Sequence, residues 1–351
     1  MIVVCGEALI DRLPPPPPSR GIFPSPARGG ESGWGLEVGG ADSPGGGPFN
    51  TARALARLGI PTQFLGRLST DAFGQQIRDL LAADGVDPSL TSFGPEPTTL
   101  GIADVDPDGH AAYRFVIDGT SAPNLTPQML PASLDPRVRA LHVGTLGLVL
   151  EPIATTIAAL VEREHSDRLV MVDPNIRPFA LPPRGGGSGW EVSYRARLDR
   201  IIAQSTIVKA SDADIAWLFP RLALPPRRGG SGWGVELESA ARALLARGPR
   251  LVVVTMGAEG AVGVSANAEV QVPAPVVQVV DTIGAGDAFG AALLAWLHDH
   301  GRLSRELRLE RDELRAALEF ACLVASVTCT RAGADPPWRS ELDHPPEFPP
   351  L

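Results

Sequence analysis

Short apolar runs alternate with segments of helical periodicity along most of this sequence, and that alternation limits the fold more than any other feature. Residues 140–143 and 169–172 are largely apolar, and residues 152–164 between them repeat apolar positions with the helical period. Strands that are joined by helices form a mostly parallel sheet with both faces covered. The sequence therefore predicts an α/β fold with a central, mostly parallel sheet.

The same alternation continues on both sides of this unit. Capping residues and helical periodicity predict further helices, and β-branched runs predict further strands. The further predicted helices are residues 49–58, 71–83, 213–218, 237–246, 285–297 and 311–327, and the further predicted strands are residues 2–4, 207–208, 251–255 and 276–280.

One stretch departs from this rhythm. Residues 98–105 and 111–117 alternate apolar and polar side chains on either side of Asp106-Pro107-Asp108-Gly109. Two alternating runs around such a turn sequence indicate a β-hairpin. We expect this hairpin to form a lid over a site on the α/β body.

Glycine and proline are concentrated in three stretches, at about 14–37, 182–190 and 225–235, and each holds a near copy of one Arg-Gly-Gly…Ser-Gly-Trp phrase. Such runs bury too little apolar surface to offset the entropy of ordering them. We interpret them as insertions into surface loops. Three binding loops with aromatic tips are the alternative.

Charge and composition exclude several classes of protein. The net charge of −9 argues against binding to nucleic acid, which needs clustered positive charge. No apolar run approaches the roughly 18 residues of a membrane span, and the N-terminus lacks the pattern of a signal peptide. Three cysteines (Cys5, Cys322 and Cys329) fit neither a disulfide framework nor a zinc site. We therefore expect a cytoplasmic protein without membrane or nucleic-acid partners.

The strongest candidate site is the segment Asp281-Thr282-Ile283-Gly284-Ala285-Gly286-Asp287, between a predicted strand and a predicted helix. The backbone N–H groups of residues 284–286 and the positive end of the helix dipole can bind an anion. Asp287 beside them can take a proton from a hydroxyl that attacks phosphorus. A glycine-rich turn with an Asp that only stabilises its helix is the alternative.

Two common nucleotide-binding motifs are absent. Gly284, Gly286 and Gly290 are spaced one residue too widely for G-x-G-x-x-G, and no acidic residue ends a strand some 20 positions later. Lys209 has no preceding glycine, so there is no Walker A loop. These observations argue against Rossmann and P-loop folds.

A second candidate site is Gly45-Gly46-Gly47-Pro48-Phe49-Asn50, at the start of a predicted helix. Its glycines let backbone amides face a ligand with many hydroxyl groups, and Asn50 can both donate and accept hydrogen bonds. A flexible loop joined to a helix cap is the alternative.

Lys209 also stands out, because it is the only lysine of the chain. Its compact charge suits a phosphate group, and a codon bias that left a single lysine is the alternative.

Together these segments resemble the two signatures of the ribokinase/PfkB family of carbohydrate kinases. The resemblance covers nearly the whole chain outside the three insertions. It implies one ribokinase-like domain over residues 1–351, a three-layer αβα sandwich with a small β lid from about 8–43 and 98–121. It also implies ATP and Mg²⁺, with transfer of the γ-phosphoryl group to a primary sugar hydroxyl.

The resemblance assigns roles to individual residues. Asp287 is the implied base, Gly284, Ala285 and Gly286 cradle the transferring phosphoryl group, and Arg177, in a strand end like those of the family, clamps the developing charge. The sugar would be held by Asp11, Gly46, Gly47 and Asn50, with Tyr113 and Arg114 from the lid. The nucleotide phosphates would be held by Lys209, Ser211, Thr255, Gly257 and Gly260.

The metal positions are also implied by the family. Asp214 stands where the family usually has Glu and is one methylene shorter, so we expect it to act on Mg²⁺ through water. Asp281, with the loop at residues 331–334, resembles the monovalent-cation site of many members, and K⁺ is the implied ion. Lid strands pair between subunits in some relatives, but the 14–37 insertion lies in that region, so both a homodimer and a monomer remain open.

The identity of the sugar is less constrained. Residues 142–145, Glu151 with Pro152, and Tyr113 with Arg114 look more like fructokinases than ribokinases, which favours D-fructose and the product fructose 6-phosphate. The strand end at 173–177 is shared with 2-keto-3-deoxygluconate kinases, whose arginine can meet a carboxylate. A homologue that binds sugar or nucleotide and regulates without catalysis is the non-enzyme alternative. Such proteins usually lose the base, whereas Asp287 is present here.

Overall fold

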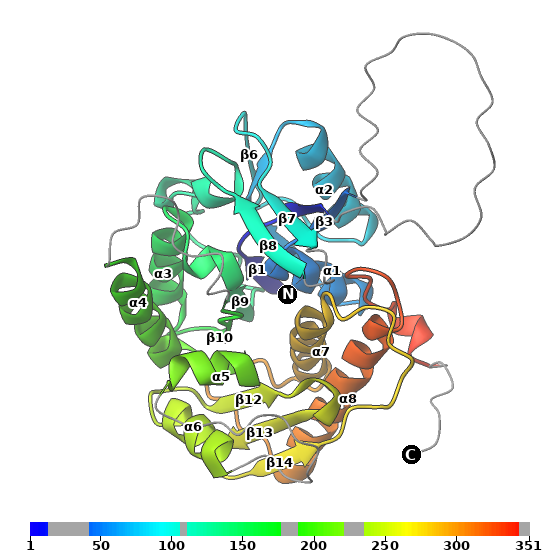
Figure 1. Ribbon diagram of the computed structural model, residues 1–351. Coiled ribbons are helices and arrows are strands. Elements are labelled where there is room, and N and C mark those ends of the chain that lie inside the picture. The colour runs from blue at the N-terminus through cyan, green and yellow to red at the C-terminus, as the bar shows by residue number, and fades with distance from the viewer. Residues whose placement is uncertain (13–41, 106–110, 177–188, 221–234, 344–351) are drawn as a thin grey trace, which may run out of the picture.

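The computed structural model describes residues 1–12, 42–105, 111–176, 189–220 and 235–343 (Figure 1). Its central sheet has the strand order β14-β13-β12-β11-β10-β9-β1-β4. Six strands are parallel, and a hairpin makes the β14 edge antiparallel. The parallel strands are β1 (Ile2–Cys5), β4 (Thr62–Leu65), β9 (Ala140–Gly144), β10 (Leu169–Asp173), β11 (Ile207–Ser211) and β12 (Leu251–Thr255), and the hairpin is β13 (Ala261–Ser265) with β14 (Glu269–Val272).

Helices cover both faces of this sheet because the strands are apolar on both sides. In β1, Ile2 and Val4 pack into one cluster of buried side chains, and Val3 and Cys5 pack into the other. The first cluster includes side chains from α1 (Gly47–Arg57), α2 (Ala72–Ala83), α7 (Ala285–Asp299) and α8 (Arg311–Cys329), and the second includes side chains from α3 (Ile153–Glu164), α4 (Trp190–Gln204), α5 (Asp212–Leu218) and α6 (Val235–Leu245). This is the predicted three-layer αβα arrangement.

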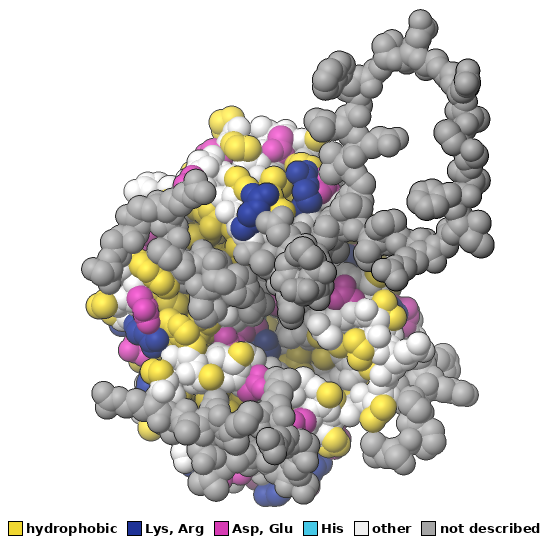
Figure 2. All heavy atoms as spheres, viewed as in Figure 1, with side chains coloured by type: hydrophobic (Ala, Val, Ile, Leu, Met, Phe, Trp, Pro, Cys, Tyr) yellow, Lys and Arg dark blue, Asp and Glu magenta, His cyan; other side chains and the backbone are white. Residues whose placement is uncertain are grey.

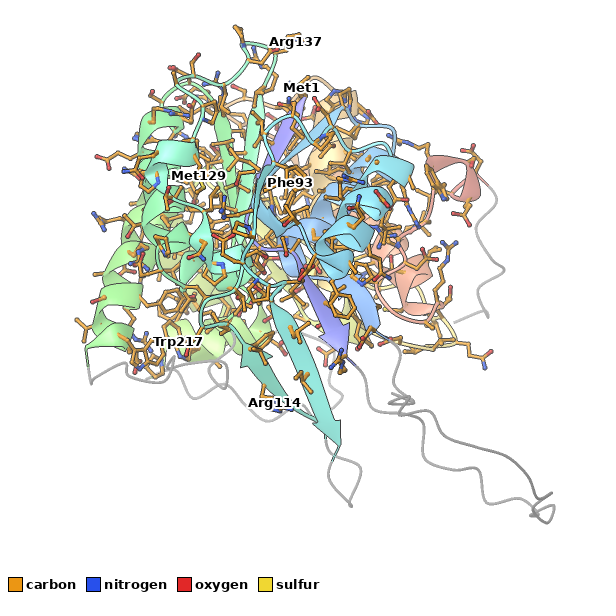
Figure 3. The ribbon with its side chains drawn as sticks, turned by 90° about the horizontal axis from the view of Figure 1, so that it is seen from above. Met1, Phe93, Arg114, Met129, Arg137 and Trp217 are labelled. Carbon is orange, nitrogen blue, oxygen red and sulfur yellow. The ribbon has the colours of Figure 1, made fainter. Side chains whose placement is uncertain are left out.

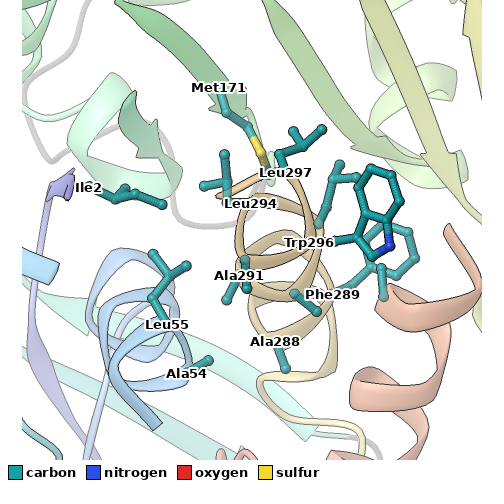
Figure 4. Close-up of a cluster of buried hydrophobic side chains, with 14 of the residues drawn as sticks. Ile2, Ala54, Leu55, Met171, Ala288, Phe289, Ala291, Leu294, Trp296 and Leu297 are labelled. Carbon is teal, nitrogen blue, oxygen red and sulfur yellow. The ribbon is translucent and has the colours of Figure 1, made fainter. Parts of the chain in front are cut away.

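Helix α7 runs through the middle of the first cluster (Figure 4). All of its residues from Asp287 to Leu297 are buried. Leu55 of α1 and Met171 of β10 lie beside Ala291 and Leu294 in this core. Because apolar contacts surround α7, the position of its first turn is fixed relative to the ends of the strands.

A second, four-stranded sheet has the order β3-β2-β7-β8. The predicted hairpin is present, since Leu100 pairs with Val116 in an antiparallel ladder. Of the three predicted insertions, only Gly189, Trp190 and Val235 are among the described residues. The strands are β2 (Leu9–Arg12), β3 (Asp42–Gly45), β7 (Leu100–Val105) and β8 (Ala111–Val116), and a separate pair is formed by β5 (Arg67–Ser69) and β6 (Ser92–Gly94).

The prediction of a strand at residues 276–280 is wrong. This segment has no regular structure, and Val276, Val279 and Val280 are exposed. It connects β14, at the edge of the sheet, to α7, which packs over the middle, so it must cross the sheet instead of extending it. Helix α4 and the β13–β14 hairpin were not predicted. Among the described residues, no helix is both long and apolar enough to cross a membrane.

Candidate functional site

A cavity of about 500 Å³ lies between the second sheet and the ends of the central strands. Both candidate segments of the sequence contribute to it, although they are far apart along the chain. The predicted site residues that line it are Asp11, Gly46, Gly47, Asn50, Lys209, Ser211, Asp214, Thr255, Gly284, Gly286 and Asp287.

Asp287 lies in the first turn of α7 and is only 8% exposed. Its Oδ2 accepts a hydrogen bond from Asn50 Nδ2 at 2.9 Å. This contact joins the two predicted segments directly. Asn50 is itself buried, so the bond holds the Asp287 carboxyl group in one orientation at the cavity wall.

The start of α7 is built to leave backbone amides near the cavity. Gly284, the residue before the helix, has φ of 76°, and a Cβ there would lie 2.6 Å from the Cβ of Ala334. Only glycine adopts this conformation readily at such close approach. Among the described side chains, none caps this helix end. This end of α7 has the local form of an anion site, which stays a prediction, and the N–H of Ala285, one of the expected donors, donates to the carbonyl of Thr282 at 3.3 Å.

Lys209 forms a buried ion pair with Asp173, with 2.6 Å between its Nζ and Asp173 Oδ2. Both side chains are at most 5% exposed. Burial lowers the pKa of Lys209, but the charge and the hydrogen bond of Asp173 outweigh it, and the pKa is raised overall. A Cβ on Gly286 would lie 3.2 Å from Lys209 Nζ. The ammonium group therefore stays charged beside the start of α7.

Asp214 organises the loop that follows β10. Its Oδ1 accepts from the backbone N–H of Ile176 at 2.6 Å, and its Oδ2 accepts from the N–H and the hydroxyl of Ser211 at 2.8 and 2.7 Å. Burial, followed by the charge of Asp173, raises the pKa of Asp214, although its hydrogen bonds oppose this. Asp214 and Ser211 form a capping box at the start of α5.

Asp11 brings a second carboxyl group into the cavity from β2. Burial raises its pKa to about 6. A Cβ on Gly101 of the neighbouring strand would lie 2.7 Å from Asp11 Oδ1. Close packing against Gly101 within the small sheet thus fixes this carboxyl group.

A second cavity, of about 420 Å³, adjoins the first and shares Thr255, Thr282 and Gly286 with it. Val276, Val277 and Val279 form an apolar wall of this cavity, so the exposed side chains of Val276 and Val279 face it. Three more predicted site residues, Gly257, Gly260 and Ala285, line this second cavity.

Of the remaining predicted site residues, the side chains of two fall outside the described part of the structure and two lie away from these cavities. Arg177 and the Tyr113 side chain lie outside what the structure describes. Arg114 is exposed on the projecting strands of the small sheet (Figure 3), where basic side chains are visible on the surface (Figure 2). Asp281 lines neither cavity; it accepts from the N–H groups of Ile283 and Gly333 at 3.0 and 2.9 Å.

Glu7, Thr145 and Asn175 also line the first cavity but were not among the predicted site residues, although the strand ends at 142–145 and 173–177 had been singled out. Each follows a strand of the parallel sheet at its carboxyl end. Ligands of open α/β sheets bind at this edge. The rule could therefore have identified all three residues if it had been applied to every strand. Asp173, the partner of Lys209, was missed for the same reason.

The buried carboxyl group of Glu7 should make the stability of the protein depend on pH. It is 1% exposed, and burial raises its pKa from 4.5 to about 8. Because the folded protein holds this proton more tightly than the unfolded chain, the stabilisation is complete below pH 4.5 and is lost as the pH rises towards 8. Each pH unit within this window should remove up to about 1.4 kcal/mol. Urea unfolding of the wild type between pH 5 and 8 measures this slope.

The Glu7→Gln variant isolates the contribution of Glu7, because Asp11 and Asp214 titrate in the same direction and remain in both proteins. The difference in unfolding free energy between wild type and variant should shrink steadily as the pH rises. Parallel stability curves for the two proteins would show that Glu7 does not hold a proton in this range.

The sequence of residues 38–341 matches the family described as pfkB family carbohydrate kinase. A fructokinase from Rhizobium leguminosarum bv. trifolii is 37% identical over 89% of this chain and 84% of its own, and one from Klebsiella pneumoniae is 31% identical over 85% and 90%. The crystal structure of a fructokinase with bound ATP from Xylella fastidiosa superposes with a TM-score of 0.79 at 24% identity, over 97% of this chain and 96% of that one, which shows the fold. The predicted family, fold and enzyme class are thus confirmed. The chain belongs to the pfkB family of carbohydrate kinases.

Proposed function

We propose that this protein transfers the γ-phosphoryl group of ATP to the 6-hydroxyl of D-fructose, giving fructose 6-phosphate and ADP. The observation that carries the proposal is the place of Asp287. Its carboxyl group, held by Asn50, lies in a cavity beside the amide end of α7 and next to a second cavity. The fructokinases among the relatives support the choice of sugar.

The reaction follows from this geometry. The sugar hydroxyl gives its proton to the Asp287 carboxylate as its oxygen forms a bond to the γ-phosphorus. The bond from the γ-phosphorus to the bridging oxygen breaks, and its electron pair leaves with ADP. The amides at the start of α7 and the Lys209 ammonium group stabilise the negative charge on the transferring group. The protein contributes mainly by positioning and charge stabilisation.

The nucleotide would occupy the second cavity, with its phosphates towards Thr255 and Gly286, which line both. Mg²⁺ neutralises charge on such phosphates when it is bound. Among the described residues, no group of three His, Cys, Asp or Glu side chains can hold a metal ion. A magnesium ion that is held mainly by phosphates and water fits this donor set. Asp214, whose oxygens already accept backbone hydrogen bonds, would contact it through water.

The charges of the first cavity favour a neutral sugar over a sugar acid. Its described lining includes the carboxyl groups of Asp11, Asp214 and Asp287, besides that of Glu7, which keeps its proton at neutral pH, whereas Lys209 is its one cation and is paired with Asp173. A substrate carboxylate would meet more negative than positive charge there. This supports fructose over 2-keto-3-deoxygluconate.

The proposal also includes the location of the enzyme in the cell and a site for a monovalent cation. The three cysteines are all free thiols, which supports a reducing compartment, and we place the enzyme in the cytoplasm. Asp281 bridges the loop before α7 to the loop at Gly333, so it would organise the backbone carbonyl groups of these loops around K⁺.

An ADP-release assay with ATP and Mg²⁺ tests the function directly. The panel is fructose, ribose, 2-keto-3-deoxygluconate and adenosine, with a reaction lacking sugar as the control for ATP hydrolysis. We expect the highest kcat/KM with fructose. A preference for 2-keto-3-deoxygluconate would move the substrate to a sugar acid, and no sugar-dependent release would support a binding protein without catalysis.

A further inference from the structure

Thr145 has an unusual backbone conformation for its residue type. It follows β9 directly, at φ of 56°. Positive φ is strained for a β-branched residue. Among the described residues, the only other non-glycine residue with positive φ is Asn175, and both line the first cavity. The two strained positions thus occur side by side at the ends of neighbouring strands β9 and β10.

The strained conformation places the Thr145 hydroxyl opposite Asp287. A Cβ added at Gly47 would overlap Thr145 Oγ1 and would lie 3.3 Å from Asp287 Oδ1. The two oxygen atoms therefore face the same small space above Gly47, within about 6 Å of each other. A single hydroxyl group spans that separation when it hydrogen-bonds to both at roughly 2.8 Å. No hydrogen bond of the Thr145 side chain occurs within the part of the chain that is described.

The turn that carries Thr145 is held in place. Thr145–Leu148 forms a 3-10 turn, and the N–H of Gly147 donates to Glu7 Oε2 at 2.9 Å. A Cβ on Gly147 would lie 2.9 Å from Ile157 of α3, so the turn has no room to move outward. The buried Glu7 carboxyl group and α3 therefore fix the strained turn from two sides.

We propose that Thr145 binds the sugar hydroxyl that receives the phosphoryl group. This inference rests on the proposed sugar kinase function. The Thr145 O–H donates a hydrogen bond to the acceptor oxygen while that oxygen donates its own proton to Asp287. One lone pair of the acceptor oxygen is then held by Thr145, and the other is directed to the γ-phosphorus. Thr145 keeps its proton throughout and positions the nucleophile.

A binding cycle tests this contact. The affinities of fructose and of 6-deoxyfructose, which lacks the acceptor hydroxyl, are measured by calorimetry in the presence of ADP. The measurement is made for the wild type and for Thr145→Val, which keeps the shape of the side chain and removes the hydroxyl. We expect the preference for fructose over 6-deoxyfructose to fall by roughly three- to tenfold in the variant, the range for one hydrogen bond. Thr145→Ser, which keeps the hydroxyl, should retain the preference.

The outcomes distinguish failure of the proposed kinase function from failure of the assignment of Thr145. If the wild type does not phosphorylate fructose, the proposed function fails. If it does, and Thr145→Val weakens both sugars equally or neither, the assignment of Thr145 alone is overturned. The KM for ATP should be unchanged in Thr145→Val, which also shows that the variant is folded. If the valine variant does not fold, Thr145→Ala is measured in the same cycle with the same expectation.

Discussion

Replacing Asp287 with asparagine is expected to lower kcat by about 100-fold or more, the size of effect that follows loss of a general base. An amide cannot take the proton of the sugar hydroxyl. Its carbonyl oxygen can still accept from Asn50, so the local geometry at the start of α7 should persist. The KM values for fructose and ATP should therefore change little. Steady-state kinetics of wild type and Asp287→Asn measure this difference.

Asp299→Asn provides a matched control on the same helix. Asp299 lies at the last turn of α7, is bound to Arg339, and lines neither cavity. The Asp299→Asn substitution removes one carboxylate from the same helix without touching the site, so the kinetics of this variant should equal those of the wild type. Near-normal turnover of Asp287→Asn beside an active control would contradict the assignment of Asp287 as base.

The parts of the site that could be predicted from sequence are those built by local segments. A glycine-rich stretch before a helix, with an acidic residue in the first turn, predicts a helix start without a side-chain cap and a carboxyl group beside it, and the Asp287 segment has this local structure. The glycines before α1 are a second such case, and the contact between Asn50 and Asp287 joins the two. These features depend on neighbours along the chain, which the sequence gives directly.

The parts that could not be predicted depend on neighbours in space. The strain at Thr145 and the burial of Glu7 arise because β1 and β9 are adjacent in the sheet, although these strands are far apart in sequence. Apolar runs also cannot show whether a segment joins a sheet. Residues 276–280 have the composition of a strand, yet three of their valines line the second cavity, because α7 lies over the middle of the sheet and not at its edge.

The largest expected effect on stability comes from separating the buried pair of Lys209 and Asp173. Asp173→Leu leaves the Lys209 ammonium group buried without its counter-charge, and Asp173 Oδ2 is the oxygen that it contacts. Loss of one partner from such a pair destabilises proteins by about 3–5 kcal/mol. Urea unfolding at pH 7, with fits of the midpoint and of the slope, measures the change.

The double variant Asp173→Leu with Lys209→Met distinguishes a charge effect from a packing defect. Replacing both charged groups by apolar ones of similar size should recover most of the lost stability, because no unpaired charge remains buried. Activity should not return, since Lys209 lies beside Gly286, where the phosphates are expected. If the double variant is as unstable as Asp173→Leu, the loss comes from packing around β10 and β11, and the ion pair is not what stabilises this part of the sheet.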